Sequence, residues 1–83
     1  MKTYQVHVRV MPRVGLLDPA GQAVEHALAS LGFGGASNVH LGKAIALDLE
    51  GRDEADARDR ARAMCERLLA NPVTEDFTIE VTA

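Results

Sequence analysis

The chain has 83 residues, of which 47% are hydrophobic and only 4% aromatic, and its formal net charge is -3. This length predicts a single domain over residues 1–83 with a small aliphatic core. The acidic balance disfavours nucleic acid, the single cysteine excludes an internal disulfide, and no apolar run has signal-peptide or transmembrane character, so we expect a cytoplasmic protein without a membrane partner.

Two elements are predicted at the start of the chain. Apolar and polar residues alternate from Thr3 to Val10, the pattern of a strand with one buried face. Asp18 and Pro19 then mark a helix start, because Asp caps free amides and Pro suits the first helical position. Apolar residues at helical spacing continue this helix to Gly32, a natural left-handed cap.

A second strand and a second helix are predicted next. Alternating apolar residues run from Val39 to Leu49, either as one long strand or as two strands bent at Gly42. Gly51 ends this segment. Asp53 can cap the following helix, which carries Cys65 on its inner face.

The sharpest boundary lies at Asn71-Pro72. The helical pattern stops there, because Pro72 cannot continue a helix and pushes Asn71 out of the α region. A strand follows, with Phe77, Ile79 and Val81 facing the core. The order β-α-β-(β)-α-β predicts an α+β two-layer sandwich related to ferredoxin-like folds, with two helices on one face of a three- to four-stranded, mostly antiparallel sheet.

The reactive side chains form no recognisable catalytic or metal site. Cys65 shares the apolar face of its helix, which indicates a buried packing residue. The histidines lack the paired spacing of metal ligands, so exposed positions are favoured, although His7 and His40 could share one sheet face. The three histidines are His7, His26 and His40.

Two polar features also have structural explanations. The glycine-rich segment 32–35 follows a helix and precedes a strand, the reverse of a phosphate-binding loop, so a cap and turn explains it. The acidic residues around Asp53 and Asp56 complement the helix dipole. We therefore expect no catalytic residue, no bound cofactor and no metal in this chain.

Two cations allow two interpretations each. Lys43 interrupts the apolar alternation beside Gly42, and Arg13 lies in the loop before the first helix. Each is either a cation offered to a partner or anionic ligand, or a solvated surface residue. For Arg13 the surface interpretation is favoured, and for Lys43 the two are even.

Three segments carry a family resemblance. They are Gly15–Gly21 with its Asp-Pro-x-Gly helix start, Val39–Lys43, and Cys65–Glu80 with its Leu-Leu-Ala-Asn-Pro-Val-x-Glu-Asp-Phe run. Together they resemble PurS, the small subunit of phosphoribosylformylglycinamidine (FGAM) synthase, over nearly the whole chain. His40 departs from the pattern, since an arginine is expected there.

The resemblance implies a three-component ligase of purine biosynthesis, which converts phosphoribosylformylglycinamide (FGAR), glutamine and ATP into FGAM, glutamate, ADP and phosphate. A glutaminase subunit would release ammonia, and a large synthetase subunit would use ATP and Mg. This chain would be non-catalytic. It would bridge these two partners, assist ammonia transfer and form a homodimer or homotetramer.

Partner contacts are expected at the turn from Arg13 to Gly21, at Gly42–Lys43 and in the loop from Asn71 to Asp76. For Asp18, Pro19 and Pro72, a purely structural role at element boundaries is the favoured explanation. The candidate interface residues are Arg13, Asp18, Gly21, Gly42, Lys43, Asn71, Pro72, Glu75 and Asp76.

Self-association has a motive in the sheet itself. The face away from the helices carries small or ambivalent residues, and the strand edges are free to pair across a dimer. These face residues are Ala44, Ala46 and Thr78. The alternative function is a small-molecule-binding regulatory module of ferredoxin-like type, which would take an amino acid or nucleotide at a dimer interface.

Overall fold

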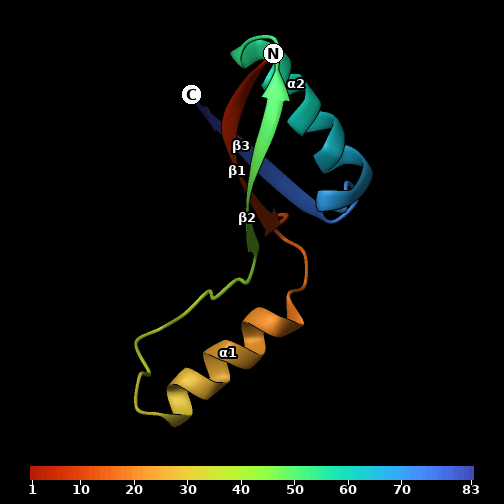
Figure 1. Ribbon diagram of the computed structural model, residues 1–83. Helices are drawn as coiled ribbons and strands as arrows, with labels where there is room; N and C mark the ends of the chain where they lie inside the picture. The colour runs from red at the N-terminus through yellow and green to blue at the C-terminus, as the bar shows by residue number, and fades with distance from the viewer.

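The structure is a computed structural model that describes all residues, 1–83. Figure 1 shows its elements in the order β1 (Lys2–Pro12), α1 (Pro19–Ser30), β2 (Lys43–Gly51), α2 (Glu54–Met64), a π-helical turn (Cys65–Leu69) and β3 (Glu75–Thr82). This β-α-β-α-β order confirms the expected α+β class.

The sheet has three antiparallel strands in the order β2-β1-β3. The central strand, β1, places Val6 opposite both Leu47 of β2 and Val81 of β3. The predicted alternation along β1 is confirmed, because one face of the strand is buried and the other is exposed. The buried side chains are Tyr4, Val6, Val8 and Val10.

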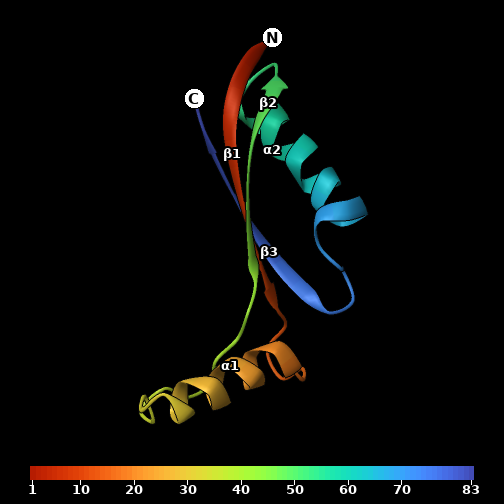
Figure 2. The ribbon, with the colours of Figure 1, turned by 60° about the horizontal axis from the view of Figure 1, so that its bottom comes forward.

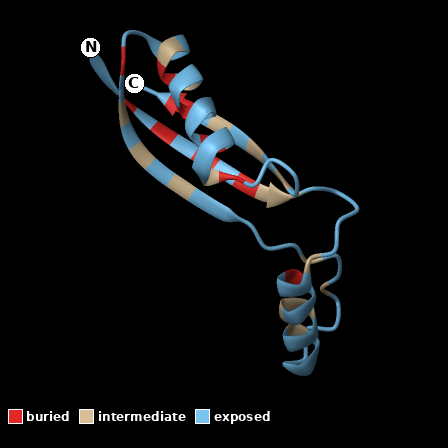
Figure 3. Ribbon diagram, turned by 90° about the vertical axis from the view of Figure 1, so that its right-hand side faces the viewer, coloured by how far each residue is buried: buried red, intermediate tan, exposed pale blue.

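Helix α2 covers the buried face of the sheet (Figure 3). It brings small side chains, Ala57 and Ala61, against the β1 valines, and Cys65 follows them in the π-helical turn. The approach is close, since a Cβ added at Gly51 would lie 3.1 Å from that of Ala57. Arg58 Nη1 also donates a 2.8 Å hydrogen bond to the Ile79 carbonyl, which ties α2 to β3.

The position of α1 corrects the expectation of two helices on one sheet face. Only α2 lies on the sheet, whereas α1 and its flanking segments, residues 13–42, project away from it (Figures 1 and 2). We call residues 13–42 the arm. The molecule is elongated accordingly, with extents of 51 × 25 × 15 Å. An amphipathic pattern shows that a helix has an apolar face, but it does not identify the surface that covers it.

The strand expected from Val39 also begins later, at Lys43, and no fourth strand forms. The preceding residues instead run along α1, where their amides find side-chain acceptors. Val39 N donates to Glu25 Oε1 at 3.1 Å, and Leu41 N donates to Asp18 Oδ2 at 2.9 Å. Alternating apolar residues therefore continue here without sheet pairing.

Asp18 joins the two halves of the arm. Its Oδ1 accepts from Gly21 N at 3.0 Å, the predicted helix cap, while its Oδ2 accepts from Leu41 N and lies 3.3 Å from His40 Nδ1. The amides of Gly21 and Leu41, and then His40, hold the pKa of Asp18 below its ordinary value of 3.8, despite partial desolvation. One carboxylate thus fixes both the start of α1 and the returning chain.

The other predicted boundaries are confirmed. Gly32 follows α1 with a φ of 97°, a left-handed conformation that suits glycine. Asp53 Oδ1 accepts from Asp56 N at 2.8 Å and caps α2. The helical segment ends at Leu69, just before Asn71-Pro72, and Ala70 is already extended.

Replacing Gly21 tests the close approach inside the arm. A Cβ there would overlap the Val39 carbonyl oxygen and the Asp18 carboxylate. We expect Gly21→Ala to lower the free energy of unfolding by about 1–3 kcal/mol, although helix propensity alone favours alanine by up to about 1 kcal/mol. Denaturant unfolding at fixed protein concentration measures the change. Gly34→Ala is the control, because nothing lies within 4 Å of a Cβ there. Equal stability of the two variants would contradict the close approach.

Acidification tests the Asp18 joint. Because the pKa of Asp18 is lowered by folding, its stabilising contribution is present above the ordinary value of 3.8 and is lost as pH falls through the lower, folded-state pKa. We expect the amide signals of Gly21 and Leu41 to titrate together in an NMR pH series, with a midpoint below 3.8. Asp18→Asn should abolish this titration. A midpoint at or above the ordinary value would refute the assignment.

Candidate partner-binding surface

The candidate residues gather mainly where the arm meets the sheet. We call this junction the waist: Arg13, Gly42–Lys43 and the Asn71–Asp76 loop. Sheet register brings the three segments together, because Pro12 pairs with Glu75 and Val10 pairs with Lys43 at the same end of β1. The waist therefore joins parts of all three expected contact surfaces.

Arg13 is held by the loop beside it. Its backbone N donates to the Thr74 carbonyl at 2.9 Å, and its Nη2 donates to the Pro72 carbonyl. Its Nε also lies 3.3 Å from Asp76 Oδ1, with both side chains still largely exposed. An exposed ion pair contributes little by itself. The two bonds to backbone carbonyls give Arg13 a third role that the sequence did not suggest, as an anchor for the loop.

The loop from Asn71 to Asp76 is closed by its own polar groups. The Asn71 carbonyl accepts from Glu75 N at 2.8 Å, and Asn71 Oδ1 accepts from Val73 N at 3.0 Å. Glu75 Oε1 accepts from Asn71 N at 2.7 Å, next to Pro72. Asn71 and Glu75 thus shape the loop, while Val73 is presented to solvent with 75% of its surface exposed.

Gly42 and Lys43 differ in character. A Cβ at Gly42 would overlap the Val10 carbonyl and the Met11 sulfur, so this glycine is required by the close crossing of two chain segments. Lys43 opens β2 as an exposed residue and takes part in no ion pair. Lys43 is therefore the unengaged cation of the waist.

The other two candidates, Asp18 and Gly21, lie in the arm rather than at the waist. Asp18 and the 11–17 segment line a groove of about 850 Å³ beside the start of α1. Val14 and Leu17 in that segment are 100% and 74% exposed. Exposed apolar side chains next to an ordered polar joint are typical of surfaces that another protein covers.

The cysteine and the histidines take mostly the expected positions. Cys65 is fully buried, and desolvation raises the pKa of its thiol, so it packs as predicted and is not an activated nucleophile. His7 and His26 are exposed as expected. His40 is also exposed, but it belongs to the arm, so it does not share a sheet face with His7. No three His, Cys, Asp or Glu side chains are grouped to hold a metal ion.

The acidic start of α2 is explained by capping. The Arg52 amide donates to Asp56 Oδ2 at 2.8 Å, and Arg60 Nε lies 3.1 Å from the same oxygen. The bonds from Arg52, followed by those from Arg60, lower the pKa of Asp56 to about 2. Asp56 therefore stays ionised near neutral pH. It accepts hydrogen bonds at the start of the helix and does not serve as a general acid.

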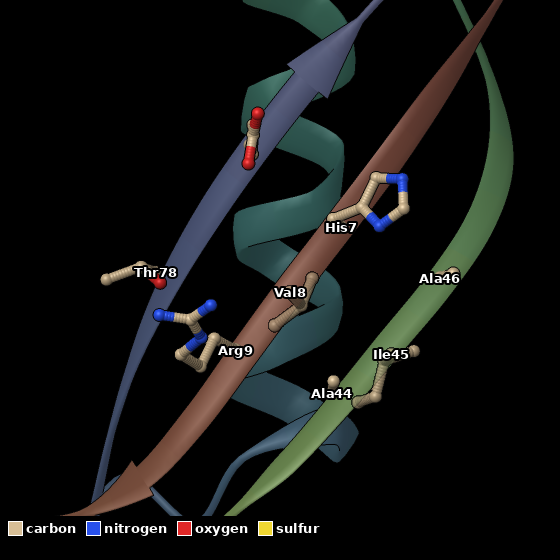
Figure 4. A pocket seen from close by; sticks show the side chains of 8 residues that line it. His7, Val8, Arg9, Ala44, Ile45, Ala46 and Thr78 are labelled. Atoms are coloured by element: carbon tan, nitrogen blue, oxygen red, sulfur yellow. The ribbon is translucent and has the colours of Figure 1, made fainter.

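The sequence analysis placed Thr78 on the sheet face away from the helices and His7 at the surface, but it missed that they form one set with Arg9 and Glu80. His7, Arg9, Thr78 and Glu80 line a hollow on the sheet face opposite α2 (Figure 4). Their polar alternation along β1 and β3 was a visible signal. Only the strand register, however, places residues from the two ends of the chain next to each other.

Neither helix combines the length and the apolar character needed to cross a membrane.

Comparison with known proteins gives a consistent result. Residues 5–83 match the PurS family, described as phosphoribosylformylglycinamidine (FGAM) synthase. The phosphoribosylformylglycinamidine synthase subunit PurS of Synechocystis is 46% identical over 81 residues, which span 98% of this chain and 81% of the relative. The subunit of Bacillus subtilis is 42% identical over 78 residues, spanning 94% and 92%.

Solved structures agree with this match. Bacillus subtilis PurS superposes with a TM-score of 0.88 at 41% identity, covering 96% of this chain and 99% of that one. A chain in the structure of PurLQS from Thermotoga maritima has a TM-score of 0.88 at 28% identity, covering 98% and 99%. Sequence and fold match over the same nearly complete length, and the chain belongs to the PurS family.

Proposed function

We propose that this chain is the small, non-catalytic subunit of FGAM synthase, the glutamine- and ATP-dependent ligase of purine biosynthesis. The observation that carries the proposal is the nearly complete match, in length and fold, to a chain of the Thermotoga maritima PurLQS assembly. In this role the chain bridges a glutaminase and a synthetase subunit in the cytoplasm and assists the transfer of ammonia. The synthetase subunit uses the ATP and Mg.

The waist is the proposed contact region for a larger subunit. Its loop is fixed by internal hydrogen bonds and by Arg13, so little conformational entropy is lost when a partner binds. Val73 supplies apolar area and Lys43 supplies an unengaged charge. An apolar contact with a charge at its edge is the usual composition of a specific interface.

Self-association is proposed to cover the apolar face of α1, which is exposed in the single chain. One side of α1, extended by Leu31 directly after it, carries exposed apolar side chains, so the helix has a face that its own sheet does not cover. On the α2 side of the sheet, the outer strands in turn carry apolar side chains that are only partly buried, such as Leu47, Phe77 and Ile79. The exposed residues of this face are Ala20, Ala23 and Ala27 of α1 and Leu31, which follows the helix.

A reciprocal dimer would satisfy both surfaces. Each α1 would lie beside α2 on the sheet of the second copy, which would restore two helices on one sheet face. Burial of apolar surface contributes about 25 cal/mol per Å², so a helix-sized contact supplies the driving force that this arm lacks in the single chain. Tetramers would then arise by pairing of dimers through the free strand edges.

The dimer is tested by placing a charge on the apolar face of α1. Ala27 is exposed in the single chain, so Ala27→Glu should leave the sheet folded but bury a carboxylate in the dimer. We expect analytical ultracentrifugation to show at least a tenfold weaker association. Ala29→Glu is the control, since it makes the same substitution at an exposed position two residues along, on the other side of the same helix. Unchanged association of Ala27→Glu would rule out this use of α1.

The subunit role is tested by reconstitution with the glutaminase and synthetase subunits. We expect omission of this chain to abolish FGAM formation from glutamine while formation from free ammonia continues. Such a result would place the chain in the coupling of the two active sites. Glutamine-dependent synthesis at an unchanged rate without the chain would overturn the proposal.

The same assay tests the waist with a charge reversal. Lys43→Glu should weaken co-purification with the larger subunits, because it reverses the charge that is offered to them. It should leave the fold intact, because Lys43 forms no ion pair within the chain. Lys2→Glu is the matched control, since Lys2 is also exposed but lies at the end of β1 far from Val10, the residue that pairs with Lys43. Equal co-purification of both variants would remove Lys43 from the interface.

A further inference from the structure

The sheet face opposite α2 contains a hollow of about 330 Å³ (Figure 4). Its volume lies within the range of about 300–1,000 Å³ found for small-molecule sites. Every strand of the sheet contributes to it. The side chains on this face are His7 and Arg9 from β1, Ala44 and Ala46 from β2, and Thr78 and Glu80 from β3.

Strand register sets the positions of these groups. Arg9 pairs with Ala44 on one side and with Thr78 on the other, while His7 pairs with Ala46 and Glu80. The side with β2 is therefore low and apolar, and the side with β3 is polar. Figure 4 shows the Arg9 guanidinium close to Thr78, with the His7 imidazole farther along β1 towards Ala46.

The ionisable groups around the hollow have no partners within the chain. Neither Arg9 nor Glu80 nor His7 forms an ion pair, although four arginine–carboxylate pairs form elsewhere in the structure. The Arg9 guanidinium has five N–H donors and suits a carboxylate ligand. The ionised Glu80 carboxylate only accepts hydrogen bonds and suits an ammonium group. A cation and a carboxylate thus occupy diagonal positions on adjacent strands of one sheet face, and neither forms a side-chain hydrogen bond within the chain.

These groups select for a ligand that carries both charges. The Glu80 carboxylate disfavours a simple anion, and the Arg9 guanidinium disfavours a simple cation. A zwitterion with adjacent carboxylate and ammonium groups satisfies both. The low floor over the alanines leaves room for a short side chain.

We propose that this hollow binds the zwitterion of an α-amino acid. Arg9 and the Thr78 hydroxyl take the carboxylate, Glu80 takes the ammonium group, and the amino-acid side chain lies over Ala44 and Ala46. The proposal does not depend on the subunit role, because it concerns a different surface and can be tested on the full-length chain alone. Because the hollow is open to solvent, we expect a dissociation constant in the millimolar range.

The test is an NMR titration of the isotope-labelled full-length chain at neutral pH. L-alanine is the probe, and acetate and methylammonium each supply one half of its charge. We expect L-alanine to cause saturable shifts at the amides of His7, Arg9, Thr78 and Glu80, with an affinity at least tenfold higher than that of either half-ligand. Arg9→Gln and Glu80→Gln should each weaken L-alanine binding at least tenfold.

Matched controls separate the site from general charge effects. Arg67→Gln and Glu50→Gln remove the same charges at exposed positions outside the hollow, and they should leave the affinity for L-alanine unchanged. Acetate binding as tight as L-alanine would overturn the zwitterion assignment. Shifts that do not saturate, or an affinity unchanged in Arg9→Gln, would overturn the site.

Discussion

The pairing of β1 on both sides is the interaction on which the rest of the structure depends. This strand bonds to β2 along Lys2–Val10 and to β3 along Gln5–Pro12, so both neighbours take their positions from it. Its buried valines form the surface on which α2 packs. Because the last residues of β1 pair only with β3, that pairing carries the 71–76 loop to the root of the arm, where Arg13 can hold it. The waist is thus a consequence of where β1 ends.

Features decided within a few residues were predictable from the sequence. The caps at Asp18 and Asp53, the stop at Gly32 and the break at Asn71-Pro72 depend on short-range bonds and backbone restrictions. Features that depend on distant partners were not. The cap at Asp18 was expected, but its second oxygen bonds to Leu41, 23 residues away, and this bond turns an expected strand into a segment held against α1.

The candidate surface divides in the same way. The Asn71-Pro72 break and the family resemblance pointed to the Asn71–Asp76 loop, and the sheet register joins it to Arg13 and Lys43. The sequence did not reveal that Asn71 and Glu75 turn their polar groups inward, because hydrogen bonding within a loop follows its backbone path. Nor did it reveal the group formed by Arg9 and Glu80. These two residues lie diagonally across one sheet face only because the first and last strands pair with each other.

The arm also affects how the molecule opens. It is joined to the sheet where the chain leaves β1 and enters β2, and by the hydrogen bonds of Arg13 to the 71–76 loop. Helix α1 makes few contacts with β1, β2 or α2. Such a segment behaves as its own cooperative unit, with a lower opening free energy than the core. By mass action, a second copy that binds only the ordered arm raises that free energy as protein concentration rises. The fraction of chains with an ordered α1 then depends on protein concentration, whereas the order of the sheet does not.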